Sequence, residues 1–387
     1  MPQPEHSQFT RVVLHAMYFL SGLGTVLIGP ALPVLGRHFS LTDLEMSYFF
    51  PAQFAGSISG TLLSSWAAKR NNYSIAVVAG ASLMAVGMML LNVDSYQACL
   101  AAFFVNGLGI GLTLPSINML VLEMSQGRAA SALSILNFCW GVGAILSKPF
   151  VDTFGTRDSL GVATWILAVP LAITAVLVLP SVRLVRLPDK EPNENSWDAP
   201  GWTSPMAWGI ALFNLINVGF ESGFGGWITS YAERVPGDPL VTWLTPTFLY
   251  FLFFVLGRAF APLLFRFLNE NAALLAGLIV VLAGMLIVLS AGGVASLGLG
   301  AMIAGLGTSW LFPTNVARFT RTFGPSSMRR ATPLFVAGTI GAASSTWLIG
   351  LVSERTGSLR SGLYVLAIGI SALIVLQIIL GTRSREV

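Results

Sequence analysis

Two glycine- and proline-containing stretches decide the fold of this chain. Residues 106–118 read NGLGIGLTLPSIN, and residues 304–315 read AGLGTSWLFPTN. In each stretch a Gly-Leu-Gly triplet inside an apolar run is followed by a proline and then an asparagine, and the two triplets begin 198 residues apart. Glycine and proline are common in membrane helices, but here their order, spacing and place in the chain all agree. The pattern predicts two halves that repeat with the same orientation.

The composition requires lipid around much of the chain. Of 387 residues, 54% are hydrophobic and 10% are charged, whereas an average soluble domain is about 25% charged. One membrane crossing needs roughly 20 apolar residues, so the apolar runs predict an all-α membrane protein with twelve transmembrane helices. The predicted spans are residues 10–36, 43–68, 74–93, 96–124, 128–154, 159–183, 204–232, 241–265, 271–292, 295–321, 329–353 and 360–381.

The basic residues predict how these spans are oriented. Fifteen of the 21 Lys and Arg residues are assigned to the loops and span ends on the side of the membrane where both termini lie. Arg258 and Arg318 are among these fifteen. Five are counted to the other side, and Lys148 lies inside a span. Because cytoplasmic loops are enriched in Lys and Arg, we expect a multi-pass protein of a bacterial-type inner (plasma) membrane with both termini in the cytoplasm.

The longest polar stretch lies near the midpoint of the chain. Residues 188–202 read PDKEPNENSWDAPGW, which is rich in proline, asparagine and charge. Such a composition is typical of a linker. The expected domains are an N-terminal six-helix bundle at 1–187, a cytoplasmic linker at 188–203 and a C-terminal six-helix bundle at 204–387.

Several functional classes find no support in the residues. Cys99 and Cys139 lie in apolar runs, and the three histidines lack the spacing of metal ligands. No nucleophile–base pair and no nucleotide-binding loop is recognisable. The basic residues that give the net charge of +4 are scattered over short loops. We therefore expect no enzyme, no cofactor, no metal and no nucleic-acid partner, and we expect a monomer in the lipid bilayer.

One acidic residue lies deep inside a predicted span. Glu221 is about sixteen residues into the seventh span, where inserting an acidic side chain costs about 2.5–3.5 kcal/mol. Asn214, Asn217 and Glu221 are spaced i, i+3 and i+7, so they share one helix face. We expect this polar stripe to line a central cavity, with Glu221 binding solute and carrying a proton. The alternative is a protonated Glu221 that only ties its helix to a neighbour by hydrogen bonds.

Polar and aromatic residues recur in other spans. Lys148 in the fifth span is four residues before Asp152, so an i, i+4 ion pair is slightly favoured over contact with an anionic solute. Tryptophans that lie deep in the spans, beside asparagine and threonine, are typical of a sugar site, although they also occur as plain packing. The predicted substrate-binding residues are Asn118, Asn137, Trp140, Asn214, Asn217, Glu221, Trp227, Trp310 and Asn315.

Three short motifs carry a family resemblance. They are residues 19–27 (FLSGLGTVL), 137–143 (NFCWGVG) and 312–314 (FPT). With the twelve spans and the repeat, they make the chain resemble the major facilitator superfamily over essentially its whole length, and within it the fucose–galactose–glucose symporter (fucose permease-like) branch. The resemblance implies two pseudo-symmetric six-helix bundles that transport a sugar by alternating access.

The chain also departs from this family pattern. After Gly60 the signature between spans 2 and 3 lacks its acidic residue. The counterpart after span 8, Gly257 with Arg258, keeps a basic part, which the resemblance assigns to gating at the cytoplasmic side. The acidic coupling residues of the branch align with Gly29 and Leu112. Proton coupling is therefore not inherited, and Glu221 is the candidate for it.

These observations predict a secondary active or facilitative transporter of a small polar solute. A monosaccharide is the favoured solute, and coupling to protons through Glu221 would make the protein a symporter. A multidrug or lipid exporter (or flippase) is one alternative, favoured by the many Phe and Met residues. An organic-anion carrier that uses Lys148 is another. A receptor or scaffold without a substrate leaves the polar stripes unexplained.

Overall fold

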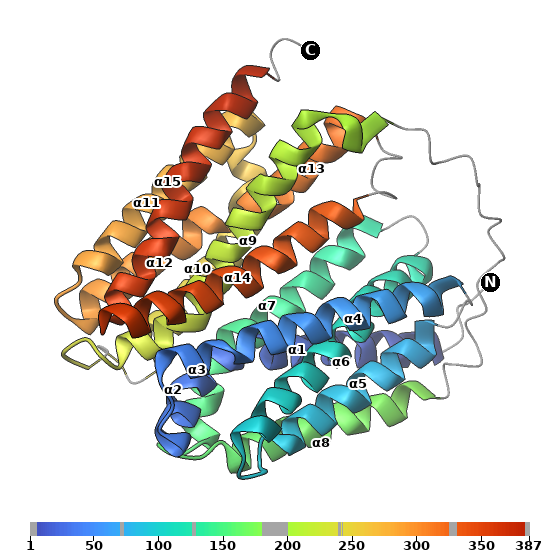
Figure 1. The fold of residues 1–387 in the computed structure, drawn as a ribbon. Coiled ribbons are helices and arrows are strands. Elements are labelled where there is room, and N and C mark those ends of the chain that lie inside the picture. Colours follow the sequence, from blue (N-terminus) through green and yellow to red (C-terminus); the bar gives the residue numbers. More distant parts are fainter. Residues whose placement is uncertain are drawn as a thin grey trace. The chain divides into compact units, whose positions relative to one another are not determined.

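The chain folds into helices that form two compact units, residues 1–190 and 191–387. The structure, a computed structural model, describes residues 6–69, 73–125, 129–179, 200–238, 241, 243–324 and 331–383. Within these residues β structure is limited to one isolated bridge between Thr156 and Ser159. Figure 1 shows the arrangement of the helices. The protein is therefore all-α, as the sequence predicts.

The first unit contains eight helices in the described residues. They are α1 (His6–Val26), α2 (Ile28–Phe39), α3 (Asp43–Ser47), α4 (Phe49–Lys69), α5 (Tyr73–Leu90), α6 (Tyr96–Met124), α7 (Ala129–Phe154) and α8 (Gly161–Val178). The second unit begins with the short helix η3 (Pro200–Thr203), and most of the predicted linker before it lies outside the described residues. Its further helices are α9 (Pro205–Ala232), α10 (Pro246–Leu264), α11 (Glu270–Ser290), α12 (Val294–Thr308), α13 (Leu311–Phe323), α14 (Thr332–Thr356) and α15 (Leu359–Arg383).

The helices match the predicted spans in order and nearly in length. In the described parts of the chain, nine helices are long and apolar enough to cross a membrane, or ten if the bent pair α1–α2 counts as one span. The other two predicted spans correspond to α4 and α9, which have 21 and 28 residues. At 1.5 Å per residue, both can cross a hydrocarbon layer of about 30 Å. The twelve predicted positions are thus all helical.

Three predicted spans are interrupted, which the hydropathy pattern does not predict. In the span 43–68, Tyr48 separates α3 from α4. The other two breaks lie between α1 and α2 and between α12 and α13. α1 and α2 meet at an angle of 44°, and only Ser309 separates the end of α12 at Thr308 from Trp310, the N-cap of α13. In both cases a proline follows the break. Pro30 cannot donate to the carbonyl of Val26, and Pro313 cannot donate to that of Ser309, because proline has no N–H.

The repeat is visible in how equivalent helices pack. A Cβ atom added to Gly107 of α6 would overlap the carbonyl oxygen of Gln53 on α4. A Cβ atom added to Gly305 of α12 would overlap the carbonyl oxygen of Tyr250 on α10 in the same way. Small residues allow membrane helices to approach until their backbones touch. The Gly-Leu-Gly triplets are therefore packing sites that recur in both units.

A second glycine contact repeats at the same interval. Gly143 of α7 lies against the carbonyl of Phe19 on α1, and Gly341 of α14 lies against the carbonyl of Leu215 on α9. Figure 1 shows α9 and α14 side by side within the second unit. These contacts hold α9, the helix that carries Glu221, in close register with α14.

Candidate solute and proton site

The predicted polar stripe lies on α9 inside the second unit. Asn214 and Asn217 are fully buried, whereas the side chain of Glu221 keeps 21% of its surface exposed. The Asn214 amide donates to the Leu334 carbonyl of α14 at 2.8 Å, so this side chain ties two helices together. Neither amide atom of Asn217 has a hydrogen-bond partner in the described parts of the chain. The three residues of the stripe therefore differ: Asn214 links α9 to α14, Asn217 is an unpaired amide among the described residues, and Glu221 is a partly exposed carboxyl group.

Glu221 pairs with an arginine on the next helix. Its Oε1 atom lies 3.8 Å from Nη2 of Arg258, whose side chain is 31% exposed. The sequence analysis counted Arg258 to the loops and ends on the cytoplasmic side. That count is wrong, because Arg258 is the thirteenth residue of the 19-residue helix α10. The site therefore combines an acid and a base inside two neighbouring helices. The sequence indicated only a gating role for Arg258 and did not predict this pairing.

Arg258 is held in one orientation by two contacts besides Glu221. Its guanidinium group lies over the ring of Phe254, 4.0 Å from the centroid. Its Nε donates to the carbonyl of Ser309 at 3.1 Å. That carbonyl is free because Pro313, four residues later, has no N–H to donate to it. The proline that breaks the span thus creates the acceptor that orients Arg258.

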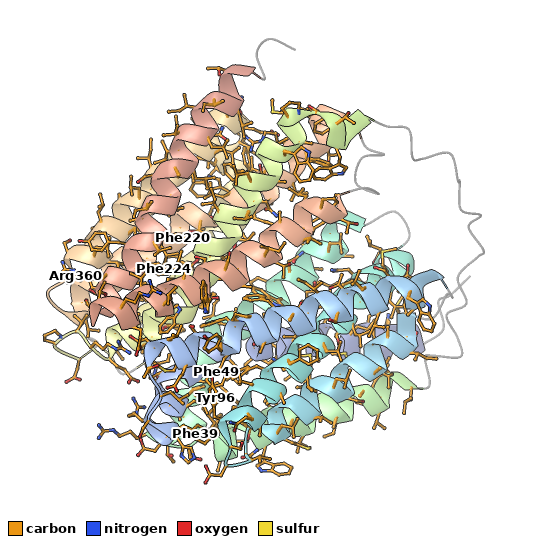
Figure 2. The ribbon with its side chains drawn as sticks, viewed as in Figure 1. Phe39, Phe49, Tyr96, Phe220, Phe224 and Arg360 are labelled. Carbon is orange, nitrogen blue, oxygen red and sulfur yellow. The ribbon has the colours of Figure 1, made fainter. Side chains whose placement is uncertain are left out.

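The neighbourhood of the pair is aromatic. Phe220 and Phe224, one turn apart on α9, stack with centroids 5.5 Å apart (Figure 2). Phe224 packs on Tyr250 at 4.7 Å, and Tyr250 packs on Phe254 at 6.1 Å. All four rings are buried. Because Phe254 contacts Arg258, this aromatic cluster places groups of low polarity beside the charged pair, which strengthens electrostatic interactions at the site.

Three more predicted binding residues are buried elsewhere in the second unit. The indole N–H of Trp227 donates to the Thr346 carbonyl at 3.0 Å, and that of Trp310 donates to the Ala273 carbonyl at 2.9 Å. The Asn315 amide donates to the Ile210 carbonyl at 3.0 Å. Like Asn214, these side chains tie neighbouring helices, and their role in binding stays a prediction.

Another arginine that the sequence analysis assigned to the cytoplasmic span ends also lies inside a helix. Arg318 lies inside α13 and is 6% exposed, so it is part of the packed unit. It donates to Gln377 Oε1 of α15 at 2.7 Å and to Oδ1 of Asn315, and it lies over the ring of Phe213. No acidic side chain pairs with it in the described residues. Neutral amide oxygens satisfy its two terminal nitrogens.

The first unit holds the other predicted binding residues. The Tyr18 hydroxyl donates to Asn118 Oδ1 at 3.2 Å, which links α1 to α6. Asn137 is exposed on α7 and donates to the Leu133 carbonyl one turn earlier. Trp140, one turn further along α7, is partly buried against the apolar core, and its indole N–H has no partner among the described residues. Asn137 and Trp140 thus remain accessible in part.

Lys148 pairs with Asp152 one turn later on α7. The sequence favours this ion pair over contact with an anionic solute. Because Lys148 is paired with Asp152, its charge is already compensated, whereas the organic-anion hypothesis requires it for the solute. Among the described residues, no group of three or more His, Cys, Asp and Glu side chains is placed to hold a metal ion.

The long apolar helices define an integral multi-pass membrane protein. The chain belongs to the Major Facilitator Superfamily, whose family model matches residues 14–335. The curated relatives that it matches are all transporters, and the chain spans between 29% and 63% of their lengths. What those proteins carry differs from one to another.

Three relatives illustrate this range. The 4-hydroxybenzoate transporter PcaK of Acinetobacter baylyi is 23% identical over 72% of this chain and 63% of its own length. The arabinose-proton symporter of Escherichia coli is 25% identical over 49% of this chain and 39% of its own. The sodium-dependent glucose transporter 1 of Rattus norvegicus is 25% identical over 36% of this chain and 29% of its own.

Solved structures of similar fold cover nearly the whole chain. A peptide transporter POT in complex with sulfate has a TM-score of 0.79 at 15% identity, over 97% of this chain and 94% of that one. The transporter FucP in the outward conformation has a TM-score of 0.64 at 17% identity, over 97% and 99%. At such identities the likeness shows the fold alone.

Proposed function

We propose that this protein is a proton-coupled secondary transporter in which Glu221 carries the proton and Arg258 is its partner. The observation that carries the proposal is the pair itself. A carboxyl group and a guanidinium group lie 3.8 Å apart on two apolar helices, and both keep part of their surface exposed. Ionisable residues inside membrane spans are rare, and they commonly mark proton relays and ion pathways.

The pair supplies a two-state element for alternating access. With Glu221 ionised, the two charges compensate each other, and the site is closed to a competing anion. With Glu221 protonated, Arg258 loses its counter-ion and must find another partner, because an unpaired charge is costly in a medium of low polarity. Protonation and solute binding would therefore favour each other, which is the requirement for symport.

Two solute classes are supported by different observations. A monosaccharide, as in the fucose permease-like branch, agrees with the partly accessible Asn118, Asn137 and Trp140 of the first unit. It also agrees with the similarity to the arabinose-proton symporter. An organic anion agrees with the three similar 4-hydroxybenzoate transporters. In that case Arg258 would be the cation that meets the solute, since Lys148 is paired with Asp152.

The orientation follows the same proposal. Once Arg258 and Arg318 are assigned to helices, thirteen of the basic residues remain on the side of the termini and five on the other. This excess supports a cytoplasmic position of both termini by the positive-inside rule. We propose an inner-membrane monomer, with alternating access produced by rocking of the two bundles.

Accumulation assays in proteoliposomes test the proposal. Arabinose and 4-hydroxybenzoate are offered with and without an imposed pH gradient, and exchange is measured without a gradient. Glu221→Gln should abolish accumulation driven by the gradient while exchange continues. Asp152→Asn removes a carboxylate from the Lys148 pair and serves as the matched control that keeps accumulation. Undiminished accumulation in Glu221→Gln would contradict the assignment of the proton carrier.

A further inference from the structure

The charged pair on α9 and α10 also indicates what kind of solute fits the site. We propose that Arg258 is a pre-oriented subsite for the carboxylate of the solute, and that the solute class is a small organic monocarboxylate. This inference rests on the proposed function, because the same pair carries both. It differs from the sugar prediction in requiring a planar anionic group on the solute.

The first argument is the fixed plane of the guanidinium group. Stacking on Phe254 at 4.0 Å and donation from Nε to the Ser309 carbonyl at 3.1 Å restrict both its tilt and its rotation. Neither terminal nitrogen makes a hydrogen bond to the described parts of the chain. An arginine held in this way presents its two terminal N–H groups as a fork that matches a carboxylate. Little side-chain entropy remains to be lost when a ligand binds.

The second argument is the loose occupancy of that fork. The distance of 3.8 Å between Arg258 and Glu221 is longer than a hydrogen bond, whereas a bidentate arginine–carboxylate pair has N–O distances of about 2.7–2.9 Å. Glu221 therefore compensates the charge of Arg258 without using its hydrogen bonds. A carboxylate that enters from the exposed side could make both bonds, and protonated Glu221 would no longer compete with it.

Arg258 is not part of the packing pattern that the two units share, because the equivalent glycine of the first unit packs without a cation beside it. Gly60 on α4 and Gly257 on α10 are equivalent in the repeat. Gly60 lets α4 approach α6, and Gly257 lets α10 approach the end of α12. The residue after Gly60 is Thr61, whose hydroxyl donates to Ser57 on its own helix. The residue after Gly257 is Arg258, which reaches across to α12. A cation in only one of two equivalent positions indicates a role beyond packing.

Two other basic side chains inside helices differ from Arg258. Lys148 is paired with Asp152, and Arg318 is buried with its terminal nitrogens bound to amide oxygens. Lys148 thus has an ionic partner, and both terminal nitrogens of Arg318 are bound within its own unit, although its Nε has no partner among the described residues. Arg258, by contrast, combines exposure with a replaceable partner.

The titratable groups that face Glu221 are Arg258 and Tyr250, both on α10. In the described parts of α12, α13, α14 and α15, no acidic or basic side chain lies against it. Binding of an acid in the wild type should thus weaken as rising pH ionises Glu221, which then competes for Arg258. In Glu221→Gln the competitor is absent, so affinity should be higher at pH 8 and flat with pH.

Binding of acids and their amides to the detergent-purified full chain tests the subsite. The probes are benzoate, 4-hydroxybenzoate and gluconate, each beside its isosteric amide, with arabinose and glucose as neutral sugars. At least one acid should bind about tenfold or more tightly than its amide. Arg258→Lys keeps the charge but removes the fork, so it should weaken that acid by about 10- to 100-fold. Lys148→Met is the matched control and should leave the affinity unchanged.

Two further outcomes separate this inference from the proposed function. If Arg258→Lys unfolds the protein, the raised and pH-independent affinity of Glu221→Gln still tests the subsite. Acids that are all silent, or that bind no better than their amides, overturn the carboxylate subsite. Binding of a neutral sugar that is unchanged in Arg258→Lys also overturns the carboxylate subsite. Neither result contradicts proton coupling through Glu221. An acid that binds through Arg258 but moves without protons would leave the subsite and contradict the coupling.

Discussion

Replacing Gly341 with alanine tests whether backbone contact between α9 and α14 holds the second unit together. A Cβ atom at Gly341 would fall 1.9 Å from the carbonyl oxygen of Leu215, whereas ordinary contact begins at 3.4 Å. The two helices would have to separate by about 1.5 Å. The obstacle is backbone on both sides, so no side chain can rotate away to make room.

The cost of this separation follows from the contacts across the same interface. A gap of 0.5–1 Å already loses a quarter to a half of the dispersion energy of each atom pair. The hydrogen bonds from Asn214 to Leu334 and from Trp227 to Thr346 also cross it, at 2.8 and 3.0 Å. Overpacking a well-packed core typically costs about 1–3 kcal/mol. In a unit of this size 1 kcal/mol corresponds to about 2–4 °C, so we expect Tm to fall by roughly 2–12 °C.

Thermal unfolding of the purified protein in detergent is the assay. Gly143→Ala should give a similar loss, because Gly143 makes the equivalent contact with Phe19 in the first unit. Gly369→Ala on α15 is the matched control, since its nearest atom beyond the helix is a side-chain carbon of Ile216 at 3.4 Å. If Gly341→Ala melts within about 1 °C of Gly369→Ala, the close packing inferred for α9 and α14 is wrong.

Three other substitutions give distinct expected outcomes. Arg258→Met should destabilise the protein by about 1–3 kcal/mol, because it leaves Glu221 without its partner. Adding Glu221→Gln should restore part of this loss. Additive effects of the two substitutions in a double-mutant cycle would argue against coupling of the pair. Asn217→Leu should raise Tm, because it removes an amide that is buried without partners; a lower Tm would mean that Asn217 has a partner in the membrane. Pro313→Ala supplies an N–H that competes for the carbonyl of Ser309, so it should loosen Arg258 and weaken binding of an acidic solute severalfold; unchanged affinity would show that this carbonyl does not orient Arg258.

Much of the fold could be predicted from the sequence, because hydropathy and span length are local properties. The predicted span 96–124 coincides with α6, and 204–232 differs from α9 by one residue. The repeat was also readable, since glycine is needed wherever two backbones touch, and such positions recur in both halves. The breaks after Val26 and Thr308 were not predicted, because a hydropathy window averages over a single missing hydrogen bond.

The site was only half predictable. Glu221 stood out as a charge inside an apolar run. Arg258 lies inside the predicted span 241–265, but the family resemblance implied only a gating role at the cytoplasmic side, and nothing in the sequence paired it with Glu221. Aligning Gly60 with Gly257 and tracing the carbonyl freed by Pro313 would have indicated that Arg258 reaches its neighbour. The helical period placed Asn214, Asn217 and Glu221 on one face, but it could not tell which of them another helix covers.

The most direct test of the account is simultaneous measurement of proton and solute flux in proteoliposomes, with a pH-sensitive dye inside and a labelled solute outside. Addition of a transported solute should acidify the vesicle interior in the wild type. In Glu221→Gln the same solute should still enter down its gradient, but without a proton signal. Acidification of equal size in both proteins, for a solute that both transport, would contradict the claim that Glu221 carries the proton.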